Sequence, residues 1–215
     1  ELNLDLMDVK SYEEMVQRVK EKAAQTPPGE WILGRGWHQS KWDSLPEKMI
    51  GGFQTHEALS EASPNNPVFL RHASGHAAIA NAKAMEIAGV NQMSIESFQE
   101  VKVEGGEVIR DELGNPTGIF NETAVRLITK YIPKNSEDRN KMMLDLAIKA
   151  CHRNGITSFH DAGVKREIID LFISEAGKGA LDLRIYAMLT GKDRELLYEW
   201  LDKGTYSDSA GFLAI

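Results

Sequence analysis

The amino-acid sequence predicts an α/β fold that is built in two regions. After Pro133, amphipathic helices alternate with strands that are almost continuous apolar runs, which is typical of parallel β/α units whose sheet is covered on both faces. Before Pro133, glycine, proline and asparagine turns separate short strands, which indicates a mixed α+β region with antiparallel hairpins. We therefore divide the chain into an extended segment at residues 1–9, an α+β region at residues 10–133 and a β/α region at residues 134–215.

The first region begins with an alternating segment and a capped helix. Leucines at positions 2, 4 and 6 alternate with polar residues, as in a short strand or an extended segment. Ser11 and Glu14 form a capping box, which predicts a helix that ends before Pro27. The elements predicted after it are a glycine-containing strand at 31–37, a short helix near 57–61, a strand at 67–72, a helix from Asn81 to Gly89, a hairpin of 101–104 and 107–111 with a two-glycine turn, a strand at 117–120 and a helix from Glu122 to about Tyr131.

The second region alternates helix and strand in a regular order. The predicted elements are a helix capped by Ser136 with Met142, Met143, Leu146, Ala147 and Ala150 on one face, a strand at 156–159, a helix at 165–176, a strand at 183–189, a helix capped by Asp193 with Leu196, Leu197 and Trp200 inside, and a strand that opens at Gly211. Two complete β/α units do not close a barrel, which takes eight. An open doubly wound sheet is the alternative, but the usual glycine-rich phosphate turn is missing.

The composition excludes several classes of partner. The 215 residues carry a formal net charge of −7 and no basic run, so we expect neither a nucleic-acid partner nor binding to an anionic membrane. Cys151 is the only cysteine, which excludes an intramolecular disulfide and a cysteine zinc knuckle, and its neighbours predict a small core residue. No apolar stretch approaches the length that spans a membrane.

His160 and Asp161 are the first candidates for a functional site. They follow the predicted strand 156–159 and precede a turn at Gly163, and the carboxyl ends of parallel strands are where α/β barrels hold their chemistry. A histidine there can ligate a metal or carry a proton, and an aspartate can bind a substrate amine. In the structural alternative, Asp161 caps the next helix and His160 fills the strand end.

Arg71 and His76 lie around a loop that follows the strand 67–72. Both can be offered to a ligand, since arginine suits planar anionic groups. Alternatively, Arg71 pairs with a local carboxylate and His76 caps the next helix. The spacing of His72 and His76 would suit two metal ligands on a helix, but Ser74-Gly75 between them argues against helix.

Trp37 and Glu122 complete the candidates. Trp37 belongs to an aromatic-rich segment with Trp31 and Trp42; packing is the usual role of tryptophan, and the functional reading is an apolar wall over a substrate cavity. Glu122 opens a predicted helix, where the helix dipole alone favours a carboxylate, so a role in binding and a role in capping are equally supported.

Five segments in order carry a family resemblance: Pro28–Gln39, Asn66–Ala77, Asn81–Met85, Gly114–Ala124 and Gly155–Gly163. Together they resemble the amidohydrolase superfamily, in the branch of metal-dependent hydrolases similar to N-substituted formamide deformylase, some of whose members are named exoenzyme regulatory proteins. The resemblance covers nearly the whole chain. Each segment alone is a weak signal, and the set does not identify a substrate.

The resemblance implies a (β/α)8 metal-dependent hydrolase barrel. Residues 1–9 would follow its first strand, residues 10–133 would be a large α+β insertion, and residues 134–215 would be strands two and three with their helices. It also implies a divalent metal, usually zinc, that activates water to hydrolyse the C–N bond of an amide, formamide or N-acyl compound. The family's metal ligands would lie before and after this chain, so the resemblance implies no metal ligand and no catalytic residue here. The substrate-binding candidates are His160, Asp161, Arg71, His76, Glu122 and Trp37.

We expect an internal piece of a larger enzyme, because the sequence starts at Glu1 rather than methionine and stops within the apolar run 212–215. Such a piece would be inactive and would hold no metal itself, and the whole enzyme would take a small amide-type substrate. Unpaired edges of its parallel strands predict a homo-oligomer. One alternative is a non-catalytic ligand-binding or regulatory module derived from the same fold. Another is a metal-free hydrolase that uses His160, Asp161 and Glu122, but no obvious nucleophile accompanies them.

Overall fold

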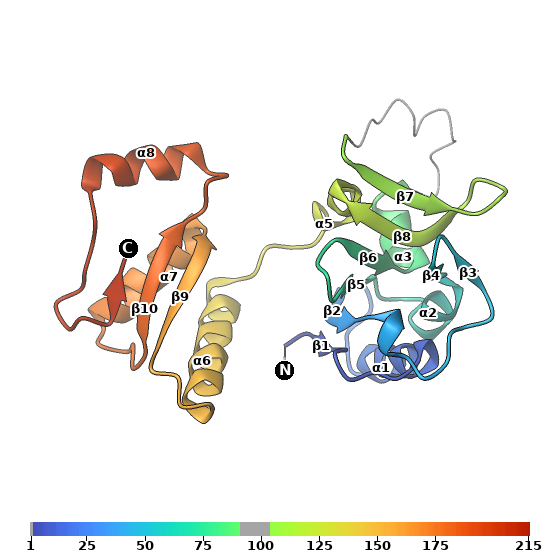
Figure 1. The fold of residues 1–215 in the computed structure, drawn as a ribbon, viewed down its shortest axis with the longest axis horizontal. Helices are drawn as coiled ribbons and strands as arrows, with labels where there is room; N and C mark the ends of the chain where they lie inside the picture. Colours follow the sequence, from blue (N-terminus) through green and yellow to red (C-terminus); the bar gives the residue numbers. More distant parts are fainter. Residues whose placement is uncertain (1, 91–103) are drawn as a thin grey trace. The chain divides into compact units, whose positions relative to one another are not determined.

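The computed structural model of the protein describes residues 2–90 and 104–215 (Figure 1). The chain divides into two compact units, Glu1–Pro133 and Lys134–Ile215. Buried apolar residues form two core clusters in the first unit and one in the second. No helix within the described residues is long and apolar enough to cross a membrane.

The first unit is built on a six-stranded mixed sheet with the order β1-β2-β5-β6-β8-β7. The first three strands of this order are parallel, and the remaining pairs are antiparallel. The strands are β1 (Leu4–Asp5), β2 (Ile32–Trp37), β5 (Val68–His72), β6 (Ala77–Ala80), β8 (Pro116–Glu122) and β7 (Gly106–Arg110). A separate antiparallel hairpin joins β3 (Met49–Ile50) and β4 (Phe53–Gln54).

Helices cover both faces of this sheet, which is why its central strands are buried on both sides. The helices are α1 (Tyr12–Ala23), η1 (Gln39–Lys41), α2 (Glu57–Ala62), α3 (Ala82–Ile87), η3 (Thr123–Val125) and α5 (Arg126–Thr129). One core cluster joins α1 and α2 to the face that carries Leu70 and Ile79. The other joins α3, η3 and α5 to the face that carries Phe69 and Phe120.

The predicted start of α1 is confirmed, with one difference in the cap. The Ser11 hydroxyl accepts the backbone N–H of Glu14 at 3.1 Å, as a capping box requires. The Glu14 carboxylate, however, accepts the N–H of Lys10 at 2.7 Å rather than that of Ser11. The predicted short helix near 57–61 and the helix that begins after Asn81 are confirmed as α2 and α3.

The glycines of β2 allow neighbouring segments to approach the strand closely. A Cβ on Gly34 would lie 2.9 Å from Cδ2 of Leu70 and 3.0 Å from Cβ of Leu4, the side chains of the two flanking strands. Gly36 has a φ of +106°, and the β2–β5 register shifts there between Arg35 and Trp37. Glycine at these positions therefore allows β1 and β5 to pack on both edges of β2.

Two predictions for the region around residue 105 have different outcomes. The strand at 117–120 is confirmed as β8, and it pairs with β7 through a turn at residues 111–115. The other predicted arm of the hairpin, residues 101–104, lies almost entirely outside the described residues. Strand β6 at Ala77–Ala80 was not predicted, because its four apolar residues, three of them alanine, do not alternate with polar residues.

The second unit is a three-stranded parallel sheet with the order β11-β10-β9. Its elements are α6 (Glu137–Arg153), β9 (Ser158–Val164), α7 (Arg166–Gly177), β10 (Arg184–Leu189), α8 (Arg194–Lys203) and β11 (Leu213–Ala214). Ser136 and Asp193 cap α6 and α8 as predicted, and Cys151 is half-buried against the core. The alternation of helix and parallel strand confirms the α/β prediction for this region.

The predicted buried face of α6 is wrong. Leu144 and Ile148 are its buried residues, whereas Met142 and Met143 are 51% and 44% exposed. Leu144, Ile148 and Cys151 follow a spacing of four and three residues, which forms a stripe of its own on the helix. The sequence offered two overlapping apolar stripes, and the one without the methionine pair contacts the sheet.

The expectation that both faces of the parallel sheet are covered is also not met within the described residues. Ile185 and Ala187 of β10 are buried under the helices, whereas the alternate residues Tyr186 and Met188 are 46% and 38% exposed. Because side chains alternate along a strand, Tyr186 and Met188 define one open face of the sheet.

Candidate functional site

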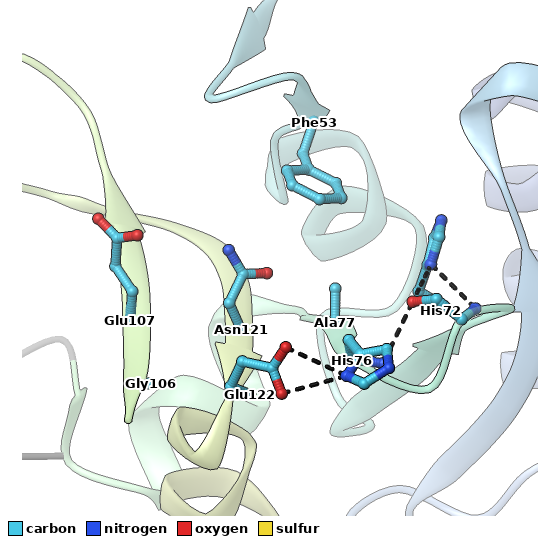
Figure 2. A pocket seen from close by; sticks show the side chains of 9 residues that line it. Phe53, His72, His76, Ala77, Gly106, Glu107, Asn121 and Glu122 are labelled. Carbon is cyan, nitrogen blue, oxygen red and sulfur yellow. Dashed lines mark hydrogen bonds and ion pairs between the residues drawn. The ribbon is translucent and has the colours of Figure 1, made fainter. Parts of the chain in front are cut away.

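A cavity of about 360 Å³ lies at one end of the first unit's sheet (Figure 2). It is lined by Phe53, His72, Ser74, His76, Ala77, Gly106, Glu107, Asn121 and Glu122. The strand register explains how these residues meet: Ala77 of β6 pairs with Asn121 of β8, and Asn121 pairs with Glu107 of β7. Three adjacent strands therefore present one row of side chains to the cavity, and Phe53 of β4 lies across from it.

His76 and Glu122 form a pair at the edge of this cavity, although 46 residues separate them in the sequence. The Nδ1 atom of His76 lies 3.1 Å and 3.2 Å from the two carboxylate oxygens of Glu122. The N–H of Glu122 also donates to the carbonyl oxygen of His76 at 2.6 Å. The structure thus brings together two of the predicted candidates. His76 does not cap α3, because Asn81 does.

The backbone of Glu122 is strained. Its φ of 50° and ψ of −125° make it the only non-glycine residue with a positive φ among the residues that the structure describes. This conformation suits glycine at the start of a tight turn and costs another residue about 1–3 kcal/mol. In this conformation the carboxylate contacts His76, and helix capping does not explain the conformation, since the Glu122 side chain makes no cap hydrogen bond.

Gly106, the strand partner of Glu122, allows this turn to close. A Cβ at Gly106 would lie 2.3 Å from the backbone nitrogen of Ala124 and 2.6 Å from Oγ1 of Thr123. Those distances are far below any real contact, so the backbone after Glu122 packs directly on Gly106. The tight packing fixes the segment that carries the Glu122 carboxylate.

His72 occupies the inner wall of the cavity and is fixed by neighbouring groups. Its Nδ1 accepts the N–H of Ser74 at 3.1 Å and lies 2.8 Å from the Ser74 hydroxyl, so its Nε2–H donates to Oε1 of Gln39 at 3.2 Å. Burial, together with the charge of nearby His38, lowers the pKa of His72 to about 4. His72 is therefore a neutral residue at pH 7.

Arg71 and Trp37 do not share this cavity. The Arg71 guanidinium lies over the ring of Phe69, 5.9 Å from its centroid, on the sheet face opposite the row that contains Ala77 and Asn121. Trp37 is completely buried, and its indole N–H donates to the carbonyl oxygen of Leu70 at 3.1 Å. The interpretation of Trp37 as a cavity wall is therefore corrected to a core position behind His72, whose ring lies 4.6 Å away.

His160 and Asp161 belong to the second unit. The strand β9 extends to Val164, so both residues lie within the strand rather than after it, and consecutive strand residues point to opposite faces. His160 lies on the open face, with its ring 5.0 Å from that of Tyr186. An apolar cavity of about 420 Å³ continues from Tyr186 to Met188 and Leu201. Asp161 does not cap α7, which starts after Lys165.

No cluster of three or more His, Cys, Asp or Glu side chains that could hold a metal ion occurs among residues 2–90 and 104–215. His72 and His76 in particular turn to different partners, Gln39 and Glu122. The described residues therefore do not fit a divalent metal by themselves, and no chemical step of this chain is derived through one.

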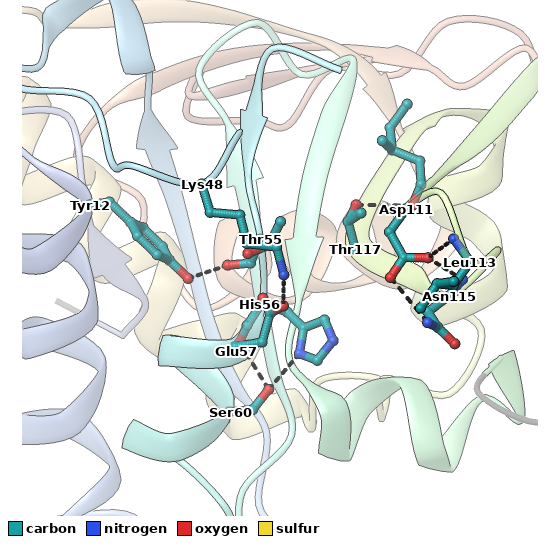
Figure 3. A network of polar contacts seen from close by, with 11 residues as sticks. Tyr12, Lys48, Thr55, His56, Glu57, Ser60, Asp111, Leu113, Asn115 and Thr117 are labelled. Atoms are coloured by element: carbon teal, nitrogen blue, oxygen red, sulfur yellow. Dashed lines mark hydrogen bonds and ion pairs between the residues drawn. The ribbon is translucent and has the colours of Figure 1, made fainter. Parts of the chain in front are cut away.

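A second polar cluster in the first unit has a structural role (Figure 3). The Tyr12 hydroxyl donates to the carbonyl oxygen of Thr55 at 2.5 Å, and the His56 N–H donates to that of Thr117 at 2.9 Å. Although burial opposes ionisation, hydrogen bonds from Lys48 and Thr55 lower the pKa of Glu57 to about 2. These contacts connect α1, α2 and β8, and they do not line the cavity of Figure 2.

Sequence reasoning did not identify Phe53, Glu107 and Asn121 as cavity residues. They come from three separate strands, and only the register of β7 and β8 and the position of the β3–β4 hairpin bring them together. The Gly105-Gly106 pair was the one local signal, and it was interpreted as a turn.

Comparison with solved structures defines the class of fold. The whole chain is similar to 38% of an uncharacterized metal-dependent hydrolase from Pyrococcus horikoshii OT3, with a TM-score of 0.64 and 22% identity. It is also similar to 39% of an uncharacterized metal-dependent hydrolase from Pyrococcus furiosus, with a TM-score of 0.61 and 25% identity. The α/β architecture is thus part of a metal-dependent hydrolase fold.

Residues 1–211 match the amidohydrolase family, and the chain belongs to that family. It is 30% identical over 160 residues to the putative amidohydrolase YtcJ of Bacillus subtilis strain 168, and 29% identical over 167 residues to N-substituted formamide deformylase of Arthrobacter pascens. Each comparison covers 74% of this chain and 28% of the relative. The chain therefore spans little more than a quarter of the length of these curated relatives, whose fold class implies a divalent metal.

Proposed function

We propose that this chain is part of a metal-dependent hydrolase that cleaves the C–N bond of a small amide, formamide or N-acyl compound, with zinc as the metal. The observation that carries the proposal is the family match over residues 1–211, together with the similarity to N-substituted formamide deformylase. In such enzymes a metal lowers the pKa of bound water and polarises the carbonyl group. The three strands β9–β11 would belong to a (β/α)8 barrel completed by other residues of the enzyme.

The role that we assign to this chain is substrate binding rather than metal binding or catalysis. His76 and Glu122 offer a fixed hydrogen-bonding pair to a ligand in the cavity of the first unit. We also assign His160 to substrate binding: it lies on the open face of the parallel sheet, and barrel enzymes hold their substrates at the carboxyl ends of such strands. Asp161 and Arg71 point away from these two surfaces, so any contact that they make with substrate would be elsewhere.

We also propose a homo-oligomer that binds neither nucleic acid nor membrane. The net charge of −7 disfavours polyanionic surfaces. The exposed Tyr186 and Met188 on the open sheet face favour self-association of the isolated chain. Sedimentation analysis at several concentrations tests this: a species that stays monomeric throughout would contradict it.

The decisive experiment compares the product of the complete open reading frame with this chain alone. Both proteins are assayed for bound metal and for amine release from a panel of N-substituted formamides and N-acyl amines. We expect near-stoichiometric zinc and turnover in the first and neither in the second. Turnover by neither protein, with ligand binding retained, would favour a non-catalytic binding or regulatory module. Stoichiometric zinc in this chain alone would mean that His72, His76 and His160 must be reconsidered as ligands.

A further inference from the structure

The cavity of the first unit is rich in hydrogen-bond acceptors. Glu107 and Glu122 contribute carboxylates, and Asn121 contributes an amide oxygen beside them. Within the described part of the chain, neither the Glu107 carboxylate nor the Asn121 amide has a hydrogen-bond or ion-pair partner. Lys48, the cation nearest in sequence to the β3–β4 hairpin, is instead paired with Glu57 at 2.5 Å. Among the described residues, no cation therefore pairs with the Glu107 carboxylate, while the Glu122 carboxylate contacts Nδ1 of His76.

The two histidines of the cavity differ in their relation to its carboxylates. Because Nδ1 of His76 contacts the Glu122 carboxylate, Nδ1 carries a proton and donates it in a hydrogen bond. His72 is neutral and satisfies both ring nitrogens with Ser74 and Gln39. A cationic ligand would therefore share the Glu122 carboxylate with His76, whereas the Glu107 carboxylate has no competing partner among the described residues.

One wall of the cavity is aromatic. Phe53 lies across from the row of Glu107, Asn121 and Ala77, and its ring meets that of His72 edge-on, with centroids 6.3 Å apart. An aromatic face opposite carboxylates suits an organic cation, because the ring attracts the charge and packs against the hydrocarbon. An inorganic cation has no hydrocarbon part to pack against this wall.

The site is also pre-organised. Glu122 is held at a positive φ, and the backbone that follows it packs directly on Gly106. Strain of this kind persists only where the surrounding structure over-determines it, and it is concentrated at ligand sites. A carboxylate that is already positioned loses less conformational entropy on binding than a free surface glutamate does.

We propose that this cavity binds a small organic ammonium group, with Glu122 and Glu107 as its charge partners and Phe53 as its apolar wall. The inference deepens the proposed function and rests on it in one respect: an amine is what hydrolysis of a substituted amide releases, so the ligand would be the amine portion of substrate or product. The binding itself requires no metal and no hydrolysis, and the present chain suffices to test it.

The test is a titration of the ¹⁵N-labelled chain, followed by NMR at low ionic strength and pH 7.5. Cyclohexylammonium is the probe, and cyclohexanol is its uncharged analogue of similar shape. We expect the ammonium to bind about tenfold more tightly than the alcohol, the equivalent of one charge-assisted hydrogen bond. The shifted signals should include the Asn121 side-chain amide and the Gly106 N–H. Equal affinity for the two probes, or shifts confined to other parts of the chain, would overturn the proposal.

Two matched variants separate charge at the cavity from charge in general. Glu122→Gln keeps the side-chain shape and should weaken cyclohexylammonium about tenfold. Glu86→Gln removes a similarly exposed carboxylate on α3 and should leave the affinity unchanged. If both variants weaken binding equally, the effect is only the net charge of the protein and the assigned site is wrong.

The outcomes also distinguish this inference from the proposed function. Amine binding without hydrolysis by the complete protein would contradict the hydrolase and keep the site. Hydrolysis by the complete protein without amine binding to the chain would contradict the site and keep the hydrolase.

Discussion

The strained backbone of Glu122 gives a prediction whose sign is opposite to common experience. At an ordinary position, glycine is less stable than alanine by about 0.5–1 kcal/mol, because its unfolded state has more conformational freedom. At Glu122, alanine keeps the penalty of a positive φ, which is about 1–3 kcal/mol, whereas glycine relieves it. We therefore expect Glu122→Gly to be more stable than Glu122→Ala by about 1 kcal/mol.

The comparison of two substitutions at one site separates the backbone strain from the loss of the contact with His76. Both lose the contact with His76, which is a solvent-exposed pair worth at most about 1 kcal/mol, so its loss cancels in the difference. The same two substitutions at Glu86, which is in the helix α3, should show the ordinary order, with alanine more stable than glycine.

Urea unfolding of the whole chain, followed by tryptophan fluorescence, measures the effect. Trp37 and Trp42 are buried in the first unit and report on its unfolding. With a slope of about 2 kcal/mol per molar urea, the expected difference moves the midpoint by about 0.5 M. If Glu122→Ala is as stable as Glu122→Gly, the backbone at this position is not strained, and the argument that the site is pre-organised fails.

Three further predictions concern pH, packing and the corrected helix face. The pKa of His72 falls from 6.5 in the unfolded chain to about 4 in the folded protein. Between these two pH values only the unfolded state takes up the proton. The free energy of unfolding is therefore at its full value above pH 6.5 and decreases as the pH falls. The free energy of unfolding should be about 2 kcal/mol lower at pH 5 than above pH 6.5. In urea unfolding, the stability of His72→Gln should depend less on pH than that of the unchanged protein. The same pH dependence in both proteins would contradict the lowered pKa of His72. Gly106→Ala should destabilise the first unit by about 2 kcal/mol or more in the same assay, since the new Cβ meets the backbone nitrogen of Ala124, and a neutral effect would contradict the packing. Leu144→Ala should lower the stability of the second unit by about 2–4 kcal/mol in thermal unfolding followed by circular dichroism. Met142→Ala should change this stability by less than about 0.5 kcal/mol. A larger loss for Met142→Ala than for Leu144→Ala would mean that the face of α6 with the methionines is the buried one.

Local signals in the sequence were sufficient for most helices. Ser11, Ser136 and Asp193 each cap the helix that they were predicted to cap, because a side-chain oxygen next to an apolar period is a local and specific signal. The parallel order of the second unit followed from the alternation of helix and apolar strand. The family resemblance rested on motifs in order, and the comparisons confirm it.

What the sequence could not show depends on tertiary structure. The pairing of His76 with Glu122 follows from the β6–β8 register, which joins Ala77 to Asn121 across the sheet and has no local signature. The strand was predicted to end at residue 159, but β9 extends to Val164, so His160 and Asp161 lie within the strand and point to opposite faces. The positive φ of Glu122 could not be predicted, because glutamate gives no sign of it.

The assignment of the amine-binding cavity to a C–N hydrolase is tested most directly by steady-state kinetics. The complete open-reading-frame product and its Glu122→Gln variant would be assayed on N-cyclohexylformamide, with the released cyclohexylamine as the readout. We expect metal-dependent turnover by the complete protein. Glu122→Gln should raise KM about tenfold and change kcat by less than about twofold, because the variant binds the amine portion of the substrate less well but retains the chemistry. No turnover by the metal-loaded protein, or a fall in kcat with an unchanged KM, would contradict it.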